Sequence, residues 1–310
     1  MTFPSRSWPE VAFGIALLAL MAVLPQVLAG RYWINLLTLC LIYAIWASSW
    51  TFMSGLTGRE NFGHSLFIGI GAYAAAFLGT AGAPPWTTLP AAMVLAGLAG
   101  LLIGLPTLPL TGPYFALATL AAATIAERLF FVLGPITGGD DGVFGIPRLT
   151  GSRETFYYLT LVAAASIVGG LWLLARGRWG RILRAIGSDE AAVAAAGINA
   201  TAYKVGAFVI SAAAGGVGGA LYAHQQLYVN PHIFAVVVSV TVLIIAYVGG
   251  LGSIGGAAVA ALLLTALTDL LRDAGAYRLL VYTGILIVLL FIAPGGVLAP
   301  LWALVRGKRS

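Results

Sequence analysis

Residues 180–199 read GRILRAIGSDEAAVAAAGIN, a polar stretch in the middle of a chain that is 60% hydrophobic and only 8% charged. Apolar runs of membrane-spanning length precede and follow it. One helix needs ~20 largely apolar residues to cross a bilayer, and such runs recur along the 310 residues, whose mean hydropathy is +0.98. The pattern predicts an all-α polytopic membrane protein that forms one transmembrane domain over residues 1–310.

About ten apolar segments are predicted to span the membrane, within a range of roughly eight to ten. They lie at 11–29, 33–53, 64–80, 90–110, 113–133, 155–176, 203–229, 234–249, 252–271 and 277–293. The segment 64–80 is short and could instead form a re-entrant loop. The first segment ends near Val27-Leu28-Ala29, which resembles a signal-peptidase site. Its apolar run is longer than that of a usual signal peptide, so we expect a retained helix.

The 40 glycines of the chain suit helices that pack closely in lipid. Small residues spaced four apart let two helix backbones approach each other. Such pairs occur at 100/104, 215/219 and 252/256. Because the chain is so rich in glycine, each pair is only a weak indication of a helix contact.

Basic residues predict the orientation, since short loops rich in Lys and Arg stay in the cytoplasm. With the N-terminus inside, ten basic residues fall on the cytoplasmic face: Arg6, Arg59, Arg176, Arg178, Arg181, Arg184, Lys204, Arg306, Lys308 and Arg309. Five fall outside: Arg31, Arg148, Arg153, Arg272 and Arg278. This predicts that both termini are cytoplasmic, that 177–202 is the largest cytoplasmic loop, and that 134–154 is the longest external loop.

The segment 104–113, GLPTLPLTGP, contains three prolines. Proline removes a backbone donor and disfavours helix in the residue before it. We therefore expect irregular backbone between Pro106 and Pro113. It forms either a short turn at the interface or a segment buried in protein or facing a watery cavity.

The loop 177–202 changes character along its length. Its first part, Gly177 to Arg184, suits an amphipathic segment at an anionic membrane surface. Ser188 is then a good helix N-cap, Asp189 and Glu190 suit the first turn, and Ala191 to Ala196 favour helix. Gly197 supplies a stop. A helix of about eight residues is marginal alone, so it must dock on a partner or on its own bundle, and the residues leave both open.

Several charged and polar residues outside this loop are further candidates. A charge in the membrane costs about 2.5–3.5 kcal/mol, so Glu127 and Arg128 face a translocation path or partner, or form a structural ion pair. His64 and Tyr73 are candidates for the same contacts. In the external loop, Asp140, Asp141 and Arg148 are candidates for docking an external protein; a flexible polar connector is the alternative.

Other kinds of chemistry are not predicted. Neither lysine, Lys204 or Lys308, belongs to a Gly-Lys-Ser/Thr phosphate-binding loop. The lone Cys40 allows no intrachain disulfide, and the three histidines have no metal-ligand spacing. The net charge of +6 is scattered and forms no patch typical of nucleic-acid binding. We expect no catalytic site, metal, cofactor or nucleic-acid partner.

The block GRILRAIGSDEAAVAAAGINATAYKVGAFVISAAAGGVGGALYAH (180–224) resembles the permeases of branched-chain amino acid ABC importers, specifically their M-type subunit. The matching motifs are Gly180-Arg181, Arg184-Ala185-Ile186, Asp189-Glu190, Gly197-Ile198-Asn199 and Tyr203-Lys204. Similar blocks are FGHSLFIGIGAY (62–73), GPYFALATLAAATIAERL (112–129), TGGDDGVFGIP (137–147) and VGGLGSIGGA (248–257). Ala257 stands where the family often has Pro, and no aromatic residue adjoins Glu127 as is usual, which leaves the substrate open.

The resemblance implies a bacterial inner-membrane permease for branched-chain or related small amino acids. It implies a coupling helix at 188–197, with roles for Ser188, Asp189, Glu190, Ala191, Ala192, Gly197, Ile198 and Asn199. The implied partners are a second permease in a heterodimer, two cytoplasmic ATPases that use ATP and Mg, and an external solute-binding protein. Urea or short amides are alternative substrates.

An ion-coupled secondary transporter is the alternative from another class. Such a transporter should carry ionisable groups near the membrane midplane. Most charges of this chain fall in loops or at span ends, which favours the importer.

Overall fold

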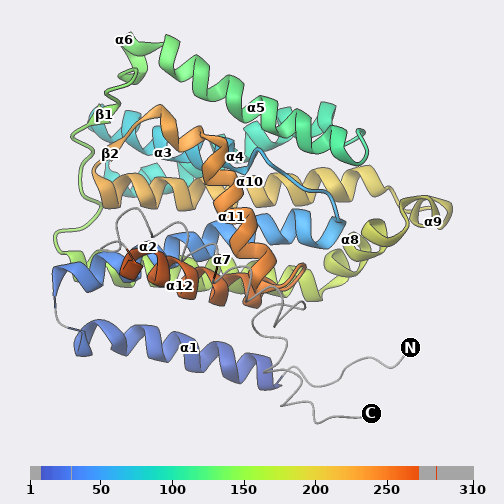
Figure 1. Cartoon of the computed structure of the whole chain (residues 1–310), viewed down its shortest axis with the longest axis horizontal. Coiled ribbons are helices and arrows are strands. Elements are labelled where there is room, and N and C mark those ends of the chain that lie inside the picture. The colour runs from blue at the N-terminus through green and yellow to red at the C-terminus, as the bar shows by residue number, and fades with distance from the viewer. Residues whose placement is uncertain (1–7, 29, 272–283, 285–310) are drawn as a thin grey trace.

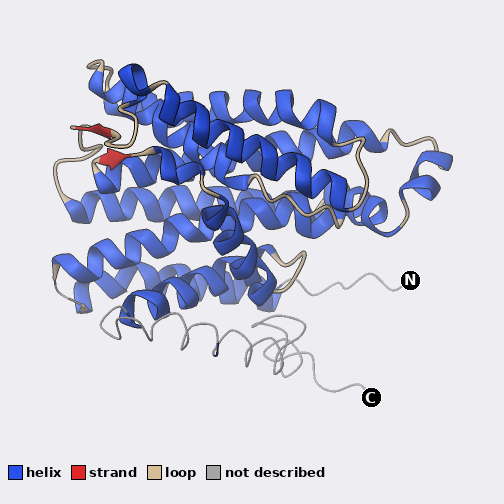
Figure 2. Ribbon diagram, turned by 45° about the horizontal axis from the view of Figure 1, so that its top comes forward, coloured by secondary structure: helices blue, strands red, loops and turns tan. Residues whose placement is uncertain are grey.

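The computed structural model describes residues 8–28, 30–271 and 284. Most of the long helices lie side by side (Figure 1), and a short pair of strands lies at one end (Figure 2). The α-helices are α1 (Trp8–Val27), α2 (Arg31–Trp50), α3 (His64–Thr80), α4 (Pro85–Thr107), α5 (Pro113–Val132), α6 (Gly134–Thr137), α7 (Arg153–Arg176), α8 (Arg178–Ser188), α9 (Glu190–Ala195), α10 (Ala200–Gln226), α11 (Val236–Gly249) and α12 (Ile254–Leu270). The remaining elements are the π-helix η1 (Thr51–Gly55), the 3-10 helix η2 (Pro231–Phe234) and the strands β1 (Val143–Phe144) and β2 (Tyr228–Val229).

The two ends of the bundle differ in what they carry. One end, called the α9 end below, carries α8 and α9 (Figure 1). The opposite end, called the strand end, carries α6 and the two strands. There Val143 pairs with Val229 in an antiparallel ladder, which ties the loop 134–154 to the connection between α10 and α11.

The prediction of a helical membrane protein is confirmed, but the prediction of ten separate spans is not supported. Nine predicted segments coincide with helices, and 277–293 lies outside the described residues apart from residue 284. Within the described residues, six helices are long and apolar enough to cross: α1, α2 with η1, α4, α5, α7 and α10. The pair of α11 and α12 adds a seventh only if its two helices count as one broken span, because they meet at a bend of 115°.

Length explains this difference. At 1.5 Å per residue the 14 residues of α11 reach about 21 Å and the 17 residues of α3 or α12 about 26 Å, short of a hydrocarbon core of about 30 Å. Gly250 and Gly252 have positive φ (96° and 78°) and end α11 there. A Cβ on Gly55 would lie 2.7 Å from the backbone N of Gly252, so this break packs tightly on η1.

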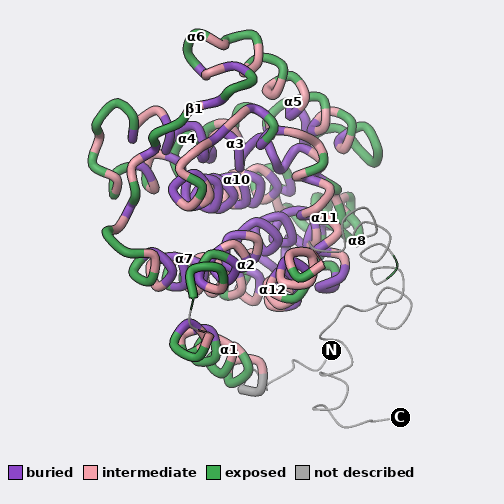
Figure 3. Tube along the Cα trace, turned by 60° about the vertical axis from the view of Figure 1, so that its left-hand side comes forward, coloured by how far each residue is buried: buried purple, intermediate pink, exposed green. Residues whose placement is uncertain are grey.

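Glycines bring α10 against α3 and α4 at the centre of the bundle. A Cβ on Gly71 of α3 would lie 2.0 Å from the carbonyl O of Gly216, and one on Gly219 would lie 2.0 Å from that of Ile68. On the α4 side, a Cβ on Gly100 would lie 2.6 Å from the Cβ of Ala212. The predicted pairs 100/104 and 215/219 therefore lie in helix contacts, and α10 is largely buried (Figure 3).

The packing predicts that Gly219→Ala destabilises the protein. The new Cβ meets backbone atoms of α3, which have no side-chain freedom to yield, so we expect a loss of about 1–3 kcal/mol in the free energy of unfolding. Gly170→Ala is the matched control, since that glycine lies inside α7 with open space around it. The measurement is the thermal unfolding temperature in detergent, and equal temperatures for the two variants would contradict the prediction.

Candidate functional site

The helix α8 is amphipathic, as the sequence predicts, but its apolar side lies on the protein itself. Ile182, Leu183 and Ile186 are buried, and Gly180 lies so close to α7 that its Cβ would meet the carbonyl O of Ala175 at 1.8 Å. The arginines of α8 are exposed: Arg178, Arg181 and Arg184. Only the charged side of α8 is therefore free to face an anionic membrane surface.

The helix α9 is shorter than predicted and starts one residue later. It spans six residues, and its N-cap is Asp189, whose Oδ1 accepts a hydrogen bond from the backbone N–H of Ala192 (3.0 Å). The prediction of Ser188 as the cap is wrong because Ser188 ends α8. The extended backbone that a cap requires is adopted by Asp189 (φ −156°, ψ 100°).

The prediction that Gly197 stops this helix is confirmed. Gly197 has φ +76° and donates its N–H to the carbonyl of Ala194 (2.9 Å), while Ile198 donates to that of Val193 (3.3 Å). These two bonds form a Schellman motif. Asn199 then caps α10, since its Oδ1 accepts from the N–H of Ala202 (3.0 Å). The Gly-Ile-Asn triplet thus builds the corner between α9 and α10.

The two faces of α9 differ sharply. Val193 is buried in a small cluster with Ile182, Ile186 and Ala200. The exposed residues of α9 and of the turn that follows it are all small: Ala191, Ala192, Ala194, Ala195, Ala196 and Gly197. The helix is therefore docked on its own bundle by one face and presents a small-residue face outward at the tip of the molecule (Figure 1).

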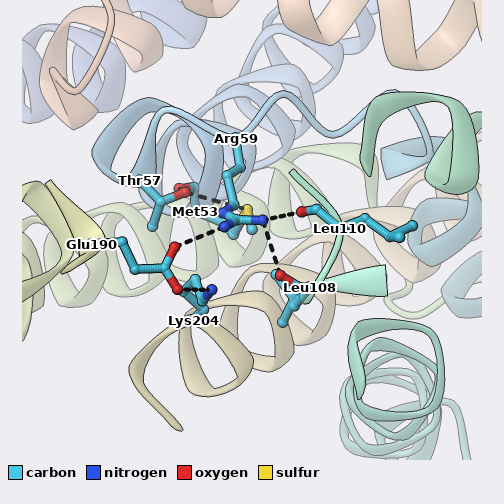
Figure 4. Close-up of polar contacts among 7 residues, drawn as sticks. All are labelled: Met53, Thr57, Arg59, Leu108, Leu110, Glu190 and Lys204. Atoms are coloured by element: carbon cyan, nitrogen blue, oxygen red, sulfur yellow. Dashed lines mark hydrogen bonds and ion pairs between the residues drawn. The ribbon is translucent and has the colours of Figure 1, made fainter. Parts of the chain in front are cut away.

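Glu190 fixes α9 through two ion pairs (Figure 4). Its Oε1 lies 2.5 Å from Nζ of Lys204 on α10, and its Oε2 lies 2.7 Å from Nη2 of Arg59 in the loop after η1. The Lys204 side chain is 3% exposed and that of Arg59 13%, whereas that of Glu190 is 37% exposed. A buried ammonium group is costly without a partner charge, so the carboxylate of Glu190 is required where it lies.

Arg59 extends this contact to the proline-rich turn between α4 and α5. Its Nη1 donates to the carbonyl O of Leu108 (2.9 Å) and also to that of Leu110 (Figure 4). The predicted irregular backbone is confirmed as the short turn 108–112, where the helix bonds that would satisfy these carbonyls are missing. We call Arg59, Glu190 and Lys204, with the carbonyls of Leu108 and Leu110, the Arg59 cluster.

The surroundings of Glu190 lower the pKa of its carboxyl group. Burial acts to raise that pKa, but the hydrogen bonds and positive charges of Lys204 and Arg59 outweigh it. Glu190 therefore stays ionised near neutral pH, and the cluster persists across that range.

The ion pairs of Arg59 and Lys204 with Glu190 were not predicted from the sequence, in which both residues count only as cytoplasmic charges. One signal was present: Lys204 is one of two lysines in the chain and follows Glu190 by 14 residues at the start of an apolar helix. No local sequence pattern connects Arg59 with Glu190, because the two residues lie 131 positions apart.

At the strand end, Glu127 contacts a histidine that sequence reasoning also missed. His232 of η2 has Nδ1 3.6 Å from Glu127 and Nε2 3.6 Å from Asp140. Within the described part of the chain, Glu127 does not form the ion pair with Arg128 that was one of the predicted alternatives, and Arg128 is exposed on α5. Two candidate site residues, Glu127 of α5 and Asp140 of the loop 134–154, thus both lie near His232.

His64 and Tyr73 lie inside the bundle rather than on a surface. His64 is 0% exposed, with Nε2 2.9 Å from Oγ of Ser49. Tyr73 is 1% exposed and stacks on Phe234 with ring centroids 5.7 Å apart. Their expected contacts with a translocation path or a partner permease remain a prediction.

The candidate docking residues of the loop 134–154 lie in two places. Asp140 and Asp141 are exposed near η2, whereas Arg148 lines a cavity beside α7 and α10. The loop is also more than a polar connector. It contains α6 and β1, and a Cβ on Gly142 would lie 2.3 Å from the carbonyl O of Val229.

A metal centre is not found among the residues that the structure describes, where no three His, Cys, Asp or Glu side chains gather suitably. The expectation that the chain binds no metal or cofactor remains a prediction.

Comparisons with known proteins agree on one family. Residues 32–293 match the family described as the permease component of the branched-chain amino acid transport system. The chain is 34% identical to the high-affinity branched-chain amino acid transport permease LivM of Escherichia coli, over 92% of this chain and 74% of that protein. It is 28% identical to BraD of Pseudomonas aeruginosa, over 86% of this chain and 94% of that protein. It is 26% identical to a probable LivH of Methanocaldococcus jannaschii, over 79% of this chain and 85% of that protein. No solved structure matches the chain.

Glu190→Gln is expected to loosen α9 from the bundle. The variant leaves the buried ammonium group of Lys204 without its carboxylate, at a cost of about 1–3 kcal/mol, less than for a fully buried pair because Glu190 is partly exposed. Hydrogen exchange of peptides covering 188–197 should accelerate at least about tenfold. Glu154→Gln, the same change on the exposed first turn of α7, should leave this exchange unaltered. Unchanged exchange in Glu190→Gln would show that the ion pairs do not hold α9.

The lowered pKa of Glu190 also predicts a pH dependence at the acid end. A carboxyl group whose pKa is lower in the folded state stabilises that state fully above its unfolded pKa, about 4.3, and loses this effect as pH falls through the folded pKa. The difference in unfolding temperature between the unaltered protein and Glu190→Gln should be constant from pH 7 to about 5 and shrink below about pH 4. A difference that persists unchanged at pH 3 would be inconsistent with this origin.

Proposed function

The chain belongs to the family of branched-chain amino acid transport system permeases, and from this premise we propose that it carries branched-chain amino acids into the cell as one half of a two-permease pore. It is a LivM-like permease subunit of an ABC importer, a transport protein rather than an enzyme. This family membership sets aside the ion-coupled secondary transporter.

The proposed assembly contains four further subunits. A second permease completes the pore, two cytoplasmic ATPases hydrolyse ATP with Mg, and an external solute-binding protein delivers the amino acid. The membership in an ABC permease family supports such an assembly, and the apolar helices support a multi-pass membrane location. We propose the bacterial inner membrane as that location.

The orientation that we propose places the α9 end in the cytoplasm and the strand end outside. The exposed arginines of α8 support this, since basic loops stay inside. Glu10 at the start of α1 pairs with Arg176 at the α9 end, which supports a cytoplasmic N-terminus. Asp269 near the end of α12 accepts from the hydroxyl of Tyr32 at the strand end (2.5 Å), so α12 ends outside in this orientation.

The observation that carries the proposed mechanism is the pair of opposite faces on α9. Its exposed alanines leave room for close approach of an ATPase, which supports a coupling role for this six-residue helix. On its other side, Glu190 bonds Arg59, and Arg59 bonds the turn between α4 and α5. Movement of α9 must therefore carry the α4–α5 turn with it or break these bonds. We propose that ATP-driven motion reaches the spanning helices by this route.

Reconstituted transport tests the function itself. The importer, assembled with its partner subunits in proteoliposomes, should take up radiolabelled leucine only when ATP and the binding protein are supplied. Excess isoleucine or valine should compete, whereas urea should not. Uptake driven by an ion gradient without ATP would contradict the proposal. Competition by urea or short amides alone would show that these compounds, and not branched-chain amino acids, are the substrates.

Arg59→Gln tests the proposed route. The variant loses the bond to Glu190 and weakens those to the α4–α5 turn, so we expect leucine uptake to fall at least about tenfold while ATP hydrolysis by the assembled importer continues. Arg178→Gln is the control, because Arg178 is an exposed arginine of the same cytoplasmic face with no ion pair among the described residues. Equal uptake by both variants would show that Arg59 does not transmit the motion.

A further inference from the structure

A polar cavity of about 90 Å³ lies at the strand end, between the starts of α2 and α7 and the end of α10. Its polar lining includes Asn35, Thr38, Arg148, Arg153, His224 and Gln225. A single water needs roughly 10–15 Å³ of such space. The cavity is therefore large enough for a carboxylate group with one or more waters.

Two arginines of this cavity have no partner within the part of the chain that the structure describes. The side chains of Arg148 and Arg153 form no ion pair and no hydrogen bond there, although Arg59 and Lys204 at the opposite end are both paired with a carboxylate. Arg148 is exposed at the rim. The cavity thus gathers two cations without a neutralising group.

The helix that begins at the cavity adds to this positive charge. Arg153 is the first residue of α7, where the helix dipole is positive and disfavours a cation. The N-cap Ser152 uses its Oγ to accept from the N–H of Thr155 (3.0 Å), so it does not offset the charge. The neighbouring Glu154 is exposed and does not line the cavity. An anion bound here would relieve this accumulation.

The cavity wall is held in place by bonds from several elements. His224 contacts the carbonyl O of Pro147 through Nδ1 (2.8 Å) and Oγ1 of Thr88 through Nε2 (2.7 Å). Gln225 donates from Nε2 to the carbonyl O of Asn35 (2.8 Å). These bonds join α2, α4, α10 and the segment before α7, so little ordering is needed when a ligand binds.

We propose that this cavity receives the carboxylate of an acidic side chain from the external solute-binding protein. The proposal rests on the proposed function, which supplies that partner and places the strand end outside. Guanidinium groups bind carboxylates through paired, charge-assisted hydrogen bonds. An arginine–carboxylate pair open to water contributes little binding free energy by itself. That is too little to retain a free anion, but it is enough to orient a protein that makes other contacts as well.

Binding of the solute-binding protein to the assembled importer in lipid nanodiscs tests the proposal. The double variant Arg148→Glu with Arg153→Glu should raise the Kd at least about tenfold and slow association, while ATP hydrolysis without the binding protein is unchanged. Arg31→Glu is the matched control. It reverses the same charge on an exposed residue of the strand end that does not line the cavity. Reversing one acidic residue of the binding protein should restore affinity for the double variant.

Three results would overturn the inference while leaving the proposed function intact. The first is unchanged binding by the double variant, and the second is an equal loss in Arg31→Glu, which would indicate general attraction. The third is that the two importers bind the binding protein with the same Kd once anionic lipid or millimolar acetate is added. That result would assign the cavity to a lipid phosphate or to a free anion. If the unaltered importer takes up leucine equally well without a binding protein, the proposed function fails and this inference fails with it.

Discussion

The buried ammonium group of Lys204 is the constraint on which the α9 end depends. It lies at the start of an apolar helix, where an unpaired charge would be costly. Glu190 supplies the opposite charge only if α9 folds back onto the bundle, and this places the second carboxylate oxygen against Arg59. Arg59 in turn satisfies carbonyls that the proline-rich turn leaves open. One electrostatic requirement thus organises three loops that are far apart in sequence.

The helix α10 connects this end to the other. Lys204 lies in its first turns, the glycines that let α3 and α4 approach lie in its middle, and His224 and Gln225 line the cavity at its far end. Because Gly216 and Gly219 meet backbone atoms of the neighbouring helices, α10 has little freedom to bend or rotate by itself. A displacement of α9 therefore acts on a packed group of helices.

The sequence allowed a correct prediction of what depends on local pattern. Hydropathy located nine helices, the prolines located the turn near 108–112, and Gly197 marked the end of α9. What failed depends on geometry that no local window contains. Apolarity alone did not reveal that α3, α11 and α12 are too short to cross the membrane separately. The N-cap of α9 is Asp189 rather than Ser188 because Asp189 has the extended backbone that a cap requires. The partners Arg59 and His232 lie more than a hundred residues from Glu190 and Glu127, so only the fold could identify them.

Whether Glu190 and Arg59 act through one shared bond can be measured by a double-mutant cycle with ATP-driven uptake as the readout. Residues that act through one contact give non-additive effects, whereas independent residues give effects that multiply. With Glu190→Gln, Arg59→Gln and the double variant measured at equal expression, we expect the double variant to transport about as well as the less active single variant. A double variant whose loss equals the product of the two single losses would contradict it.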